Sequence, residues 1–574
     1  MIQKNNITWN EDYKHNNFLY FIQRITEMLD YTTEDVFRAP LYNTPRLVDE
    51  YIRIDNGFTK DYQLEEVFKE LSEFIERDVI LNYKWGTDKI KQIKHKLNEN
   101  PKKRREVILF LRSALSQYLF WAEDYIKSII TKNPRDTNKI ERAICCYLPE
   151  LLRAGYSRDE IYHYTKNLVN DSIDPVESIS CYFSRFDLRK RKYDVYLGIS
   201  KKLLAFKAIL SQRLDVIFDT DQYFSKLTLS DEFTVVKMGD IETIDASEAA
   251  YFAFKHLELF TSYYQFLGDY SENLVNNKVL VVMEDGETRN IVTDRNKFKS
   301  VSDDKKVDIG IISTSAIDNV MIKARRSMSE LNKLINLHNR AIAGNGLENG
   351  FLNLWSIMEI VCASKEDGFK IDYCKDVAVP ILTHDYLYGM FLDITKDIIN
   401  VLEREKCDEF FKEIDGYEED IEKVVAMILL PKYKDTFTRL CDELVNYPVL
   451  YLRITKLNEC VKKRDLNKVI LNYQKFITYQ LYRFYRIRNQ ITHAGQKIVD
   501  LKDYCELLHS YVDCLIKEII NKLCNSDLRE IQNVLIDSSL IQETYFKHFD
   551  SDEPICDETI KLILSNSSIW INCD

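Results

Sequence analysis

The longest helical pattern in the chain ends in a dense group of polar side chains. Across residues 466–495, apolar side chains recur at spacings of three, four and seven, which predicts one long helix with a buried face. These apolar residues are Ile470, Tyr473, Ile477, Leu481, Phe484 and Ile491. Gly495 is expected to end the helix, because glycine readily adopts the left-handed conformation that often follows a last helical turn.

The end of this helix carries Arg488, Asn489 and His493. Arg488 is expected on the apolar side, where a guanidinium needs an acidic partner or an anionic ligand. His493 lies in the last turn, where unpaired carbonyl groups favour a protonated imidazole. The sequence thus places a permanent cation, an amide and a titratable imidazole close together. Such a set can hold a phosphate and move a proton.

A second arginine-to-histidine pair with the same spacing, Arg158 and His163, has a different setting. Ser157 and Glu160 form the pattern of a capping box, which predicts the start of a helix. A helix start offers no carbonyl groups that favour a cation. We therefore expect Arg158 and His163 to be structural.

Arg488-Asn489 followed by His493 and Gly495 resembles the signature of the HEPN superfamily, in particular ApeA-like HEPN domains. Upstream, the segment 348–359, ENGFLNLWSIME, is similar to an earlier helix of those domains, which carries a tryptophan and a glutamate four residues later. The resemblance covers about the C-terminal third of the chain. It implies a helical bundle and, in many members, a metal-independent endoribonuclease that acts as a homodimer. Other members bind nucleotides or nucleic acid without cleaving it.

The resemblance implies catalytic roles for Arg488, Asn489, His493 and Glu359 in RNA cleavage by the neighbouring 2′-hydroxyl. His493 would be the general acid or base, Arg488 would hold the scissile phosphate, and Asn489 would orient one of them. Glu359 either pairs with Arg488 and orients the site or is an exposed helix charge. The implied role is anti-phage defence or toxin action, controlled by a phage or host trigger.

Two other interpretations stay open at this point. The first is a non-catalytic HEPN scaffold that binds RNA or a nucleotide and recruits a partner. The second is a purely structural helical protein. In the structural case Arg488 and Glu359 form a buried pair and His493 caps its helix. Both interpretations predict that the chain does not cleave RNA.

Composition favours a mainly α fold in several parts. Only 15 glycines and 10 prolines occur in 574 residues, which favours helices over loop-rich β folds. We expect a helical regulatory region at 1–185, a small α+β domain at 186–315, a HEPN-like helical domain at 316–525 and an acidic C-terminal tail at 526–574. We expect the tail to be solvated; the alternatives are a helical cap and an RNA-mimicking lid. Strand patterns at 193–199 and 233–238, and a hairpin around Asp285-Gly286, define the α+β domain.

Two basic runs are the candidate RNA-binding residues. The net charge of −12 means that an RNA site must be a local basic patch. Phe186 and Tyr193, interleaved in the second run, offer rings for base stacking. The alternative for both runs is an ordinary solvated surface. The runs are Lys102, Lys103, Arg104 and Arg105, and Arg185, Arg189, Lys190, Arg191 and Lys192.

Neither a cofactor nor a metal site is expected. The 13 cysteines show no C-x2-C spacing, which indicates reduced thiols in a cytoplasmic protein. His509 lies on the apolar helix expected after Gly495, and we interpret it as a structural histidine. The sequence shows neither a signal peptide nor an apolar run long enough for a membrane span. The expected partners are therefore RNA and a second copy of the chain, with no membrane.

Overall fold

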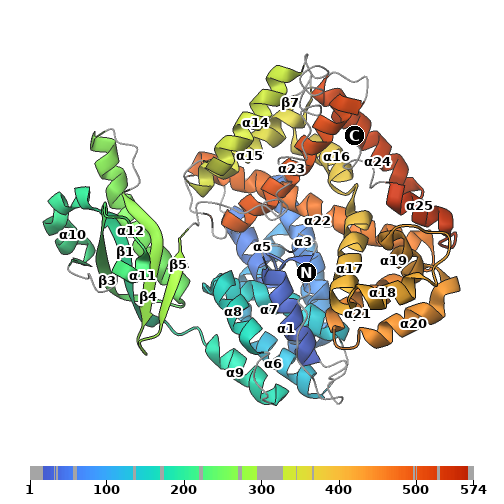
Figure 1. Ribbon diagram of the computed structural model, residues 1–574, viewed down its shortest axis with the longest axis horizontal. Helices are drawn as coiled ribbons and strands as arrows, with labels where there is room; N and C mark the ends of the chain where they lie inside the picture. Colours follow the sequence, from blue (N-terminus) through green and yellow to red (C-terminus); the bar gives the residue numbers. More distant parts are fainter. Residues whose placement is uncertain are drawn as a thin grey trace.

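The chain forms a large helical body with a smaller sheet-containing unit beside it (Figure 1). This architecture confirms the expected mainly α fold with a small α+β region. Among the residues it describes, no helix combines the length and apolar character needed to cross a membrane. The computed structural model describes residues 17–565 except 31–32, 34–36, 56–60, 133–136, 169–173, 219–223, 269–273, 294–326, 344–345, 365–367, 495–497, 499–500 and 526–529.

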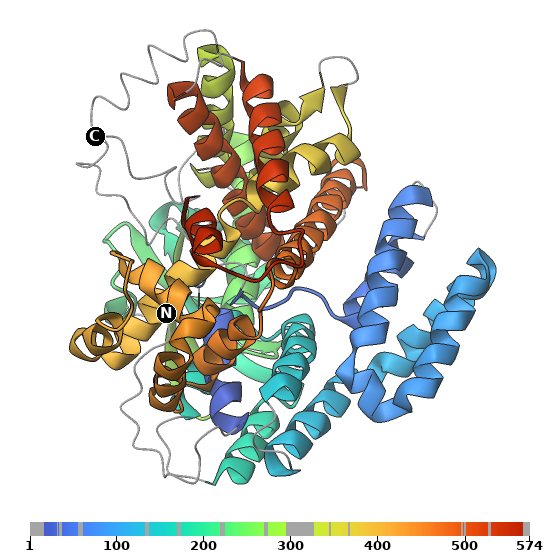
Figure 2. The ribbon, with the colours of Figure 1, turned by 90° about the vertical axis from the view of Figure 1, so that its right-hand side faces the viewer.

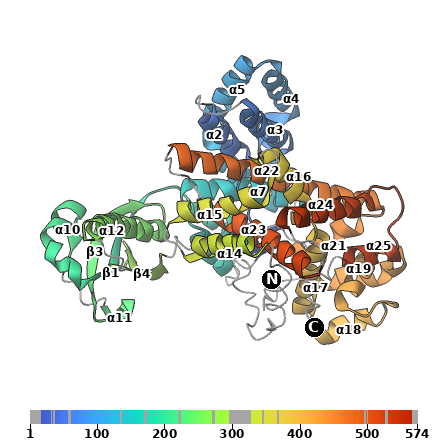
Figure 3. The ribbon, with the colours of Figure 1, turned by 90° about the horizontal axis from the view of Figure 1, so that it is seen from above.

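The N-terminal part of the body is helical, as expected. Its helices begin at ordinary caps: Asn43 accepts a hydrogen bond from the amide of Arg46, and Asn100 accepts one from Lys103 ahead of the Pro101 start. Figures 2 and 3 show the blue helices α2 to α5 standing on one side of the body. The helices are α1 (Asn17–Leu29), α2 (Thr44–Ile54), α3 (Asp61–Arg77), α4 (Val79–Glu99), α5 (Pro101–Ala114), α6 (Tyr118–Lys132), α7 (Thr137–Ala154), α8 (Arg158–Asn167) and α9 (Pro175–Arg185).

The smaller unit is an antiparallel sheet with the strand order β2-β3-β1-β4-β5 and its own apolar core. Helix α12 (Ala246–Gly268) packs against it, with Ala249, Ala250 and Ala253 fully buried. Gly286 has a φ of 85° in the turn between β4 and β5, so the expected Asp-Gly hairpin is confirmed. The other elements are β1 (Arg191–Ser200), α10 (Lys207–Leu214), β2 (Val216–Ile217), α11 (Phe224–Leu227), β3 (Phe233–Thr243), β4 (Val275–Met283) and β5 (Thr288–Val292).

The C-terminal part adds a second set of helices, which Figure 1 shows in yellow to red. A two-stranded ribbon of β6 (Ala363–Ser364) and β7 (Gly368–Phe369) follows α15. The helices are α14 (Met328–Ala343), α15 (Leu347–Val361), α16 (Ile371–Leu382), α17 (Tyr386–Leu402), α18 (Arg404–Phe411), α19 (Asp420–Leu429), α20 (Lys434–Glu443), α21 (Pro448–Asn458), α22 (Lys463–Asn489), α23 (Leu501–Asn525), α24 (Ile531–Lys547) and α25 (Asp557–Ser565).

One apolar core runs through both helical parts. It contains buried residues from Phe18 to Phe186 and from Leu331 to Ile563. The two helical parts therefore share one core, although the sheet-containing unit lies between them in the sequence. Ion pairs also join the two parts: Glu27 on α1 binds both Arg24 and Arg453, the latter on α21. The regions expected to be a separate regulatory domain and a HEPN-like domain are therefore packed as one body.

The residues expected to form a solvated acidic tail pack against this body instead. Helices α24 and α25 bury Val534, Leu535, Ile560 and Ile563 in the shared core. The expectation of a solvated tail is therefore wrong for residues 531–565. Acidic residues outnumber basic residues in this segment, but apolar residues at helical spacing bury one face.

A buried network of charges fastens α22 to the N-terminal helices. Arg483 binds Glu50 on α2 at 3.3 Å and Glu70 on α3 at 2.6 Å, and Arg486 binds the other oxygen of Glu50 at 2.7 Å. The side chains are 1–9% exposed. The ring of Tyr42 lies 3.5 Å from the guanidinium carbon of Arg483. These contacts satisfy two guanidiniums that would otherwise be costly to bury.

The pKa values of the two glutamates in this network shift in opposite directions. Burial disfavours the charged form of Glu50, yet Arg483 and Arg486 outweigh it and lower the pKa of Glu50 to about 2. For Glu70 the desolvation dominates over the attraction of Arg483, and its pKa is raised. Glu50 is therefore the charged centre of the network.

We predict that Glu50→Ala lowers the free energy of unfolding by roughly 3–5 kcal/mol, because it removes the buried carboxylate that pairs with Arg486 and leaves Arg483 with Glu70 alone. Glu73→Ala is the matched control, since Glu73 on α3 pairs with Lys475 on α22 while the two side chains are 32% and 43% exposed. The control should lose only about 0–1 kcal/mol. Urea denaturation of both variants measures the difference, and equal losses would show that the network does not fasten α22.

Candidate functional site

The long helix that the sequence predicts is α22, and its last turn changes pitch. The α-helix ends at Asn489 and a π-helical turn continues through Gln490–Ala494. Ile470, Ile477, Leu481 and Phe484 are fully buried, which confirms the predicted apolar face. Gly495 lies outside the described residues. Short π-helical turns, such as Gln490–Ala494, often occur at functional sites.

Arg488 takes part in a chain of polar contacts between α22 and α15. Its Nη2 lies 3.1 Å from Oε1 of Glu359, and its Nη1 donates to Oδ1 of Asn489 at 3.0 Å. Nε1 of Trp355 donates to the same Glu359 oxygen at 2.9 Å. The structure therefore brings Arg488, Asn489 and Glu359 together, which is the pairing alternative for Glu359.

The expected burial of Arg488 is wrong. The side chains of Arg488 and Glu359 are 29% and 27% exposed, so their pair lies at the edge of the core. The buried arginines of α22 are Arg483 and Arg486, which the sequence analysis did not single out. Several arginines lie near the apolar face of this helix, and the sequence alone does not show which of them pairs with a buried carboxylate.

The backbone of His493 lies in the π-helical turn, one turn beyond Arg488. Its side chain lies outside the described residues, so the contact between the imidazole and Arg488 or Asn489 stays a prediction. The second pair, Arg158 and His163, behaves as expected. Ser157 caps α8 by accepting from the amide of Glu160, and Arg158 binds Asp503 on α23 at 2.9 Å.

Glu359 also lines a pocket of about 570 Å³ between α14, α15 and α24. Its polar lining includes Glu330 and Lys333, so acids outnumber the cation. This balance does not suit a polyanion such as RNA. Glu359 therefore contacts both this pocket and Arg488 on α22.

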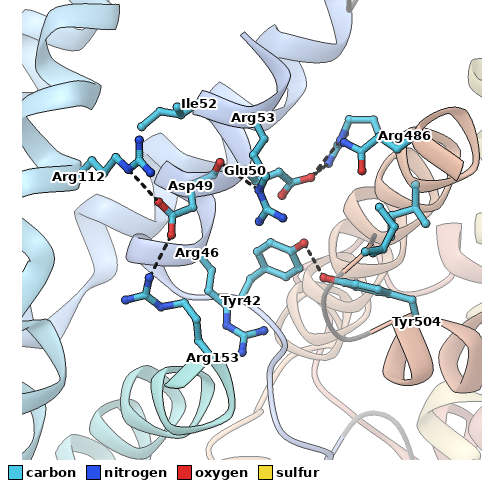
Figure 4. Close-up of a pocket in the computed structure, with 13 residues that line it drawn as sticks. Tyr42, Arg46, Asp49, Glu50, Ile52, Arg53, Arg112, Arg153, Arg486 and Tyr504 are labelled. Carbon is cyan, nitrogen blue, oxygen red and sulfur yellow. Dashed lines mark hydrogen bonds and ion pairs between the residues drawn. The ribbon is translucent and has the colours of Figure 1, made fainter. Parts of the chain in front are cut away.

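A second pocket, of about 350 Å³, is rich in arginine (Figure 4). Arg486, Ile487 and Gln490 at the end of α22 form part of its lining. Its five arginines face two carboxylates, so positive charge is in excess. The lining was missed by sequence reasoning because it comes from five helices far apart in the chain. Its charged residues are Arg46, Asp49, Glu50, Arg53, Arg112, Arg153 and Arg486.

The contacts within this pocket fix some arginines more firmly than others. Asp49 binds Arg153 at 3.0 Å and Arg112 at 3.7 Å, and Figure 4 shows it between the two. Arg46 is buried and donates to backbone oxygens of Pro149 and Leu41. Arg153 also binds Glu150 at 2.7 Å, so the exposed Arg53 and Arg112 are the ones that can turn toward a bound anion.

The first basic run is largely paired with carboxylates. Arg104 binds Glu65 at 2.7 Å and lies over the ring of Phe68, and Arg105 binds Asp55 at 2.9 Å. Lys103 lies 3.3 Å from Glu99, and Lys102 is exposed. The run therefore offers less positive charge to RNA than its sequence indicates.

The second run is also partly neutralised. Arg185 binds Glu160, Arg189 and Arg191 both bind Asp187, and Lys192 binds Asp240, while Lys190 is exposed. The expected stacking rings are unavailable, because Phe186 and Tyr193 are 1% and 3% exposed and belong to the apolar cores. That part of the expectation is wrong. A role in RNA binding for the cations of either run stays a prediction.

Comparison of the chain with protein-family models, with characterised proteins and with solved structures gives no match. The resemblance to the HEPN superfamily stays a prediction that rests on the motif residues.

We predict weak energetic coupling between Arg488 and Glu359. Because both side chains are more than a quarter exposed, a double-mutant cycle of Arg488→Ala and Glu359→Ala should give a coupling of about 1 kcal/mol or less. Urea denaturation of the two single variants and the double variant measures it. A coupling of several kcal/mol would show that the pair is a structural element of the core.

Proposed function

We propose that the chain is a metal-independent endoribonuclease that cleaves RNA by attack of the neighbouring 2′-hydroxyl. The observation that carries the proposal is the partly exposed cluster of Arg488, Asn489 and Glu359, in which Arg488 and Asn489 directly precede the turn that contains His493. A structural pair would gain nothing from exposure, whereas a phosphate-binding guanidinium has to be reached by solvent and substrate.

The chemistry follows from the groups in this cluster. A guanidinium has five N–H donors, and the contacts of Arg488 to Asn489 and Glu359 take two of them. The remaining donors suit the oxygens of a scissile phosphate, whose negative charge grows in the transition state. Glu359 fixes the orientation of the guanidinium from α15, and His493 relays the proton.

Each chain carries this motif once, and the proposal includes a homodimer in which two motifs meet. The biological role proposed with it is growth arrest in the cytoplasm, as a defence or toxin effector that responds to a phage or host trigger. Because α22 is fastened to α2 and α3 through buried charges, the N-terminal helices are well placed to control the motif.

The arginine-rich pocket favours one alternative function. A site with five arginines and two carboxylates beside the motif helix suits a phosphate-bearing ligand. A non-catalytic scaffold that binds a nucleotide or RNA there and recruits a partner is therefore the second candidate. It predicts binding without cleavage.

We predict that purified protein cleaves total cellular RNA in EDTA and leaves 2′,3′-cyclic phosphate and 5′-hydroxyl ends. His493→Ala should abolish cleavage, because it removes the proton relay, while the folded state is retained. His163→Ala is the matched control from the second arginine-to-histidine pair and should cleave at the wild-type rate. End-group analysis and gel assays measure these outcomes.

Three results would contradict the nuclease proposal. The first is cleavage by His493→Ala at the wild-type rate. The second is 3′-hydroxyl ends, and the third is activity that disappears in EDTA and returns with magnesium. RNA or nucleotide binding without any cleavage would support the scaffold alternative.

We predict that RNA uses the arginine-rich pocket. Replacing Arg53 and Arg112 by alanine should weaken RNA binding and reduce the slope of log K against log salt by about 1.4, given about 0.7 for each phosphate contact with a single strand. Fluorescence anisotropy over a salt series measures the slope. Arg404→Ala with Arg439→Ala is the control, since both are exposed and carboxylate-paired on α18 and α20. An unchanged slope in the pocket variant would place the RNA path elsewhere, with Arg189 and Lys190 as the next positions to test.

A further inference from the structure

Three side chains from α14 and α23, none of them a motif residue, converge on one point. Nε2 of His338 lies 2.8 Å from Oδ1 of Asp513 and 2.8 Å from Nε2 of His509. Nε2 of His509 lies 3.5 Å from the same Asp513 oxygen. Figure 3 shows α14 beside α15 and near α23, the helix that carries the other two residues.

Hydrogen bonds alone satisfy this triangle poorly. Because Asp513 Oδ1 and His509 Nε2 are only 3.5 Å apart, the directions from His338 Nε2 to these two atoms make an angle of less than 90°. A single N–H of His338 cannot point at both of them, because hydrogen bonds weaken steeply away from linearity. If Nε2 of His338 instead accepts a hydrogen bond from His509, this nitrogen carries a lone pair and no proton. It then repels the Asp513 carboxylate. Each arrangement of protons leaves one short contact unfavourable.

A central cation satisfies all three contacts together. Zinc lies about 2.0–2.1 Å from histidine nitrogen and about 2.0–2.2 Å from carboxylate oxygen. An ion at such distances from all three atoms would lie just off their plane, and the observed separations of 2.8–3.5 Å allow this geometry. The three candidate ligand atoms all lie within 4.8 Å of one another.

The surroundings suit a metal ligand set. The side chains of His509, Asp513 and His338 are 4%, 16% and 20% exposed, so the site is mostly enclosed yet accessible to water. A carboxylate is ordinarily ionised near neutral pH, as metal binding requires.

We propose that His338, His509 and Asp513 bind a divalent transition-metal ion of the zinc class. Two imidazoles and one carboxylate select zinc and its neighbours over calcium and magnesium, which prefer oxygen ligands. Water fills the remaining coordination positions. The ion ties α14, the first described helix after β5, to α23. This proposal replaces the expectations of no metal site and of a merely structural His509.

The test is metal binding by the full-length protein, independent of any RNA cleavage. Chelator-treated protein is titrated with Zn²⁺ by calorimetry, and with Co²⁺ while visible absorption is recorded. We expect one ion per chain at this site, a higher melting temperature with Zn²⁺, and Co²⁺ bands without the charge-transfer absorption that thiolate ligands give.

Conservative variants locate the site. His338→Gln and Asp513→Asn should each weaken Zn²⁺ binding by more than the roughly 10–100-fold that loss of an outer-shell partner causes. His256→Gln is the matched control, since His256 is a partly exposed histidine on α12 beside the carbonyl oxygen of Phe252. It should bind Zn²⁺ as the wild type does.

Several outcomes would overturn the proposal. One is wild-type protein that is folded by circular dichroism but binds no Zn²⁺, which would leave the three residues as a hydrogen-bonded cluster. Another is binding that is unchanged in both His338→Gln and Asp513→Asn. The third is a Co²⁺ spectrum with thiolate charge transfer, which would assign the ion to cysteines. If the variants do not fold, the wild-type titration and the Co²⁺ spectrum decide by themselves.

Discussion

The position of α22 depends on charges buried where two parts of the chain meet. Glu50 holds both Arg483 and Arg486, and Glu70 holds Arg483 a second time. The desolvation of these groups is tolerable only while every partner is in place. The network therefore sets the position of the helix that ends at Arg488, and with it the geometry of the candidate active site and the arginine-rich pocket.

Much of the fold follows from local patterns in the sequence. The apolar spacing of α22, the Asp285-Gly286 hairpin and the cap at Ser157 are short-range signals, and the structure confirms each of them. The burial of residues 531–565 escaped prediction because acidic composition was weighed above apolar spacing. The joining of the two helical parts also escaped, because it depends on contacts between residues hundreds of positions apart.

The candidate sites show the same division. The pairing of Glu359 with Arg488 was one of the alternatives that the sequence left open, and the family resemblance drew attention to both residues. The arginine-rich pocket and the cluster around His338 carry weak local signals. On α23, His509 and Asp513 are four residues apart and lie on one face, which hints at a ligand pair. Their third member is distant in sequence, so the triangle appears only when α14 is placed beside α23.

The buried network also bears on how such a chain can change by recombination. A gene segment that encodes only the C-terminal helices would deliver Arg483 and Arg486 to a new protein without their carboxylates. The transplanted helix would then carry two desolvated cations, and the hybrid would be selected against before any activity could matter. Lineages that exchange this motif should therefore keep residues 44–77 in the same inherited unit, although more than 400 positions separate them from the motif in the sequence.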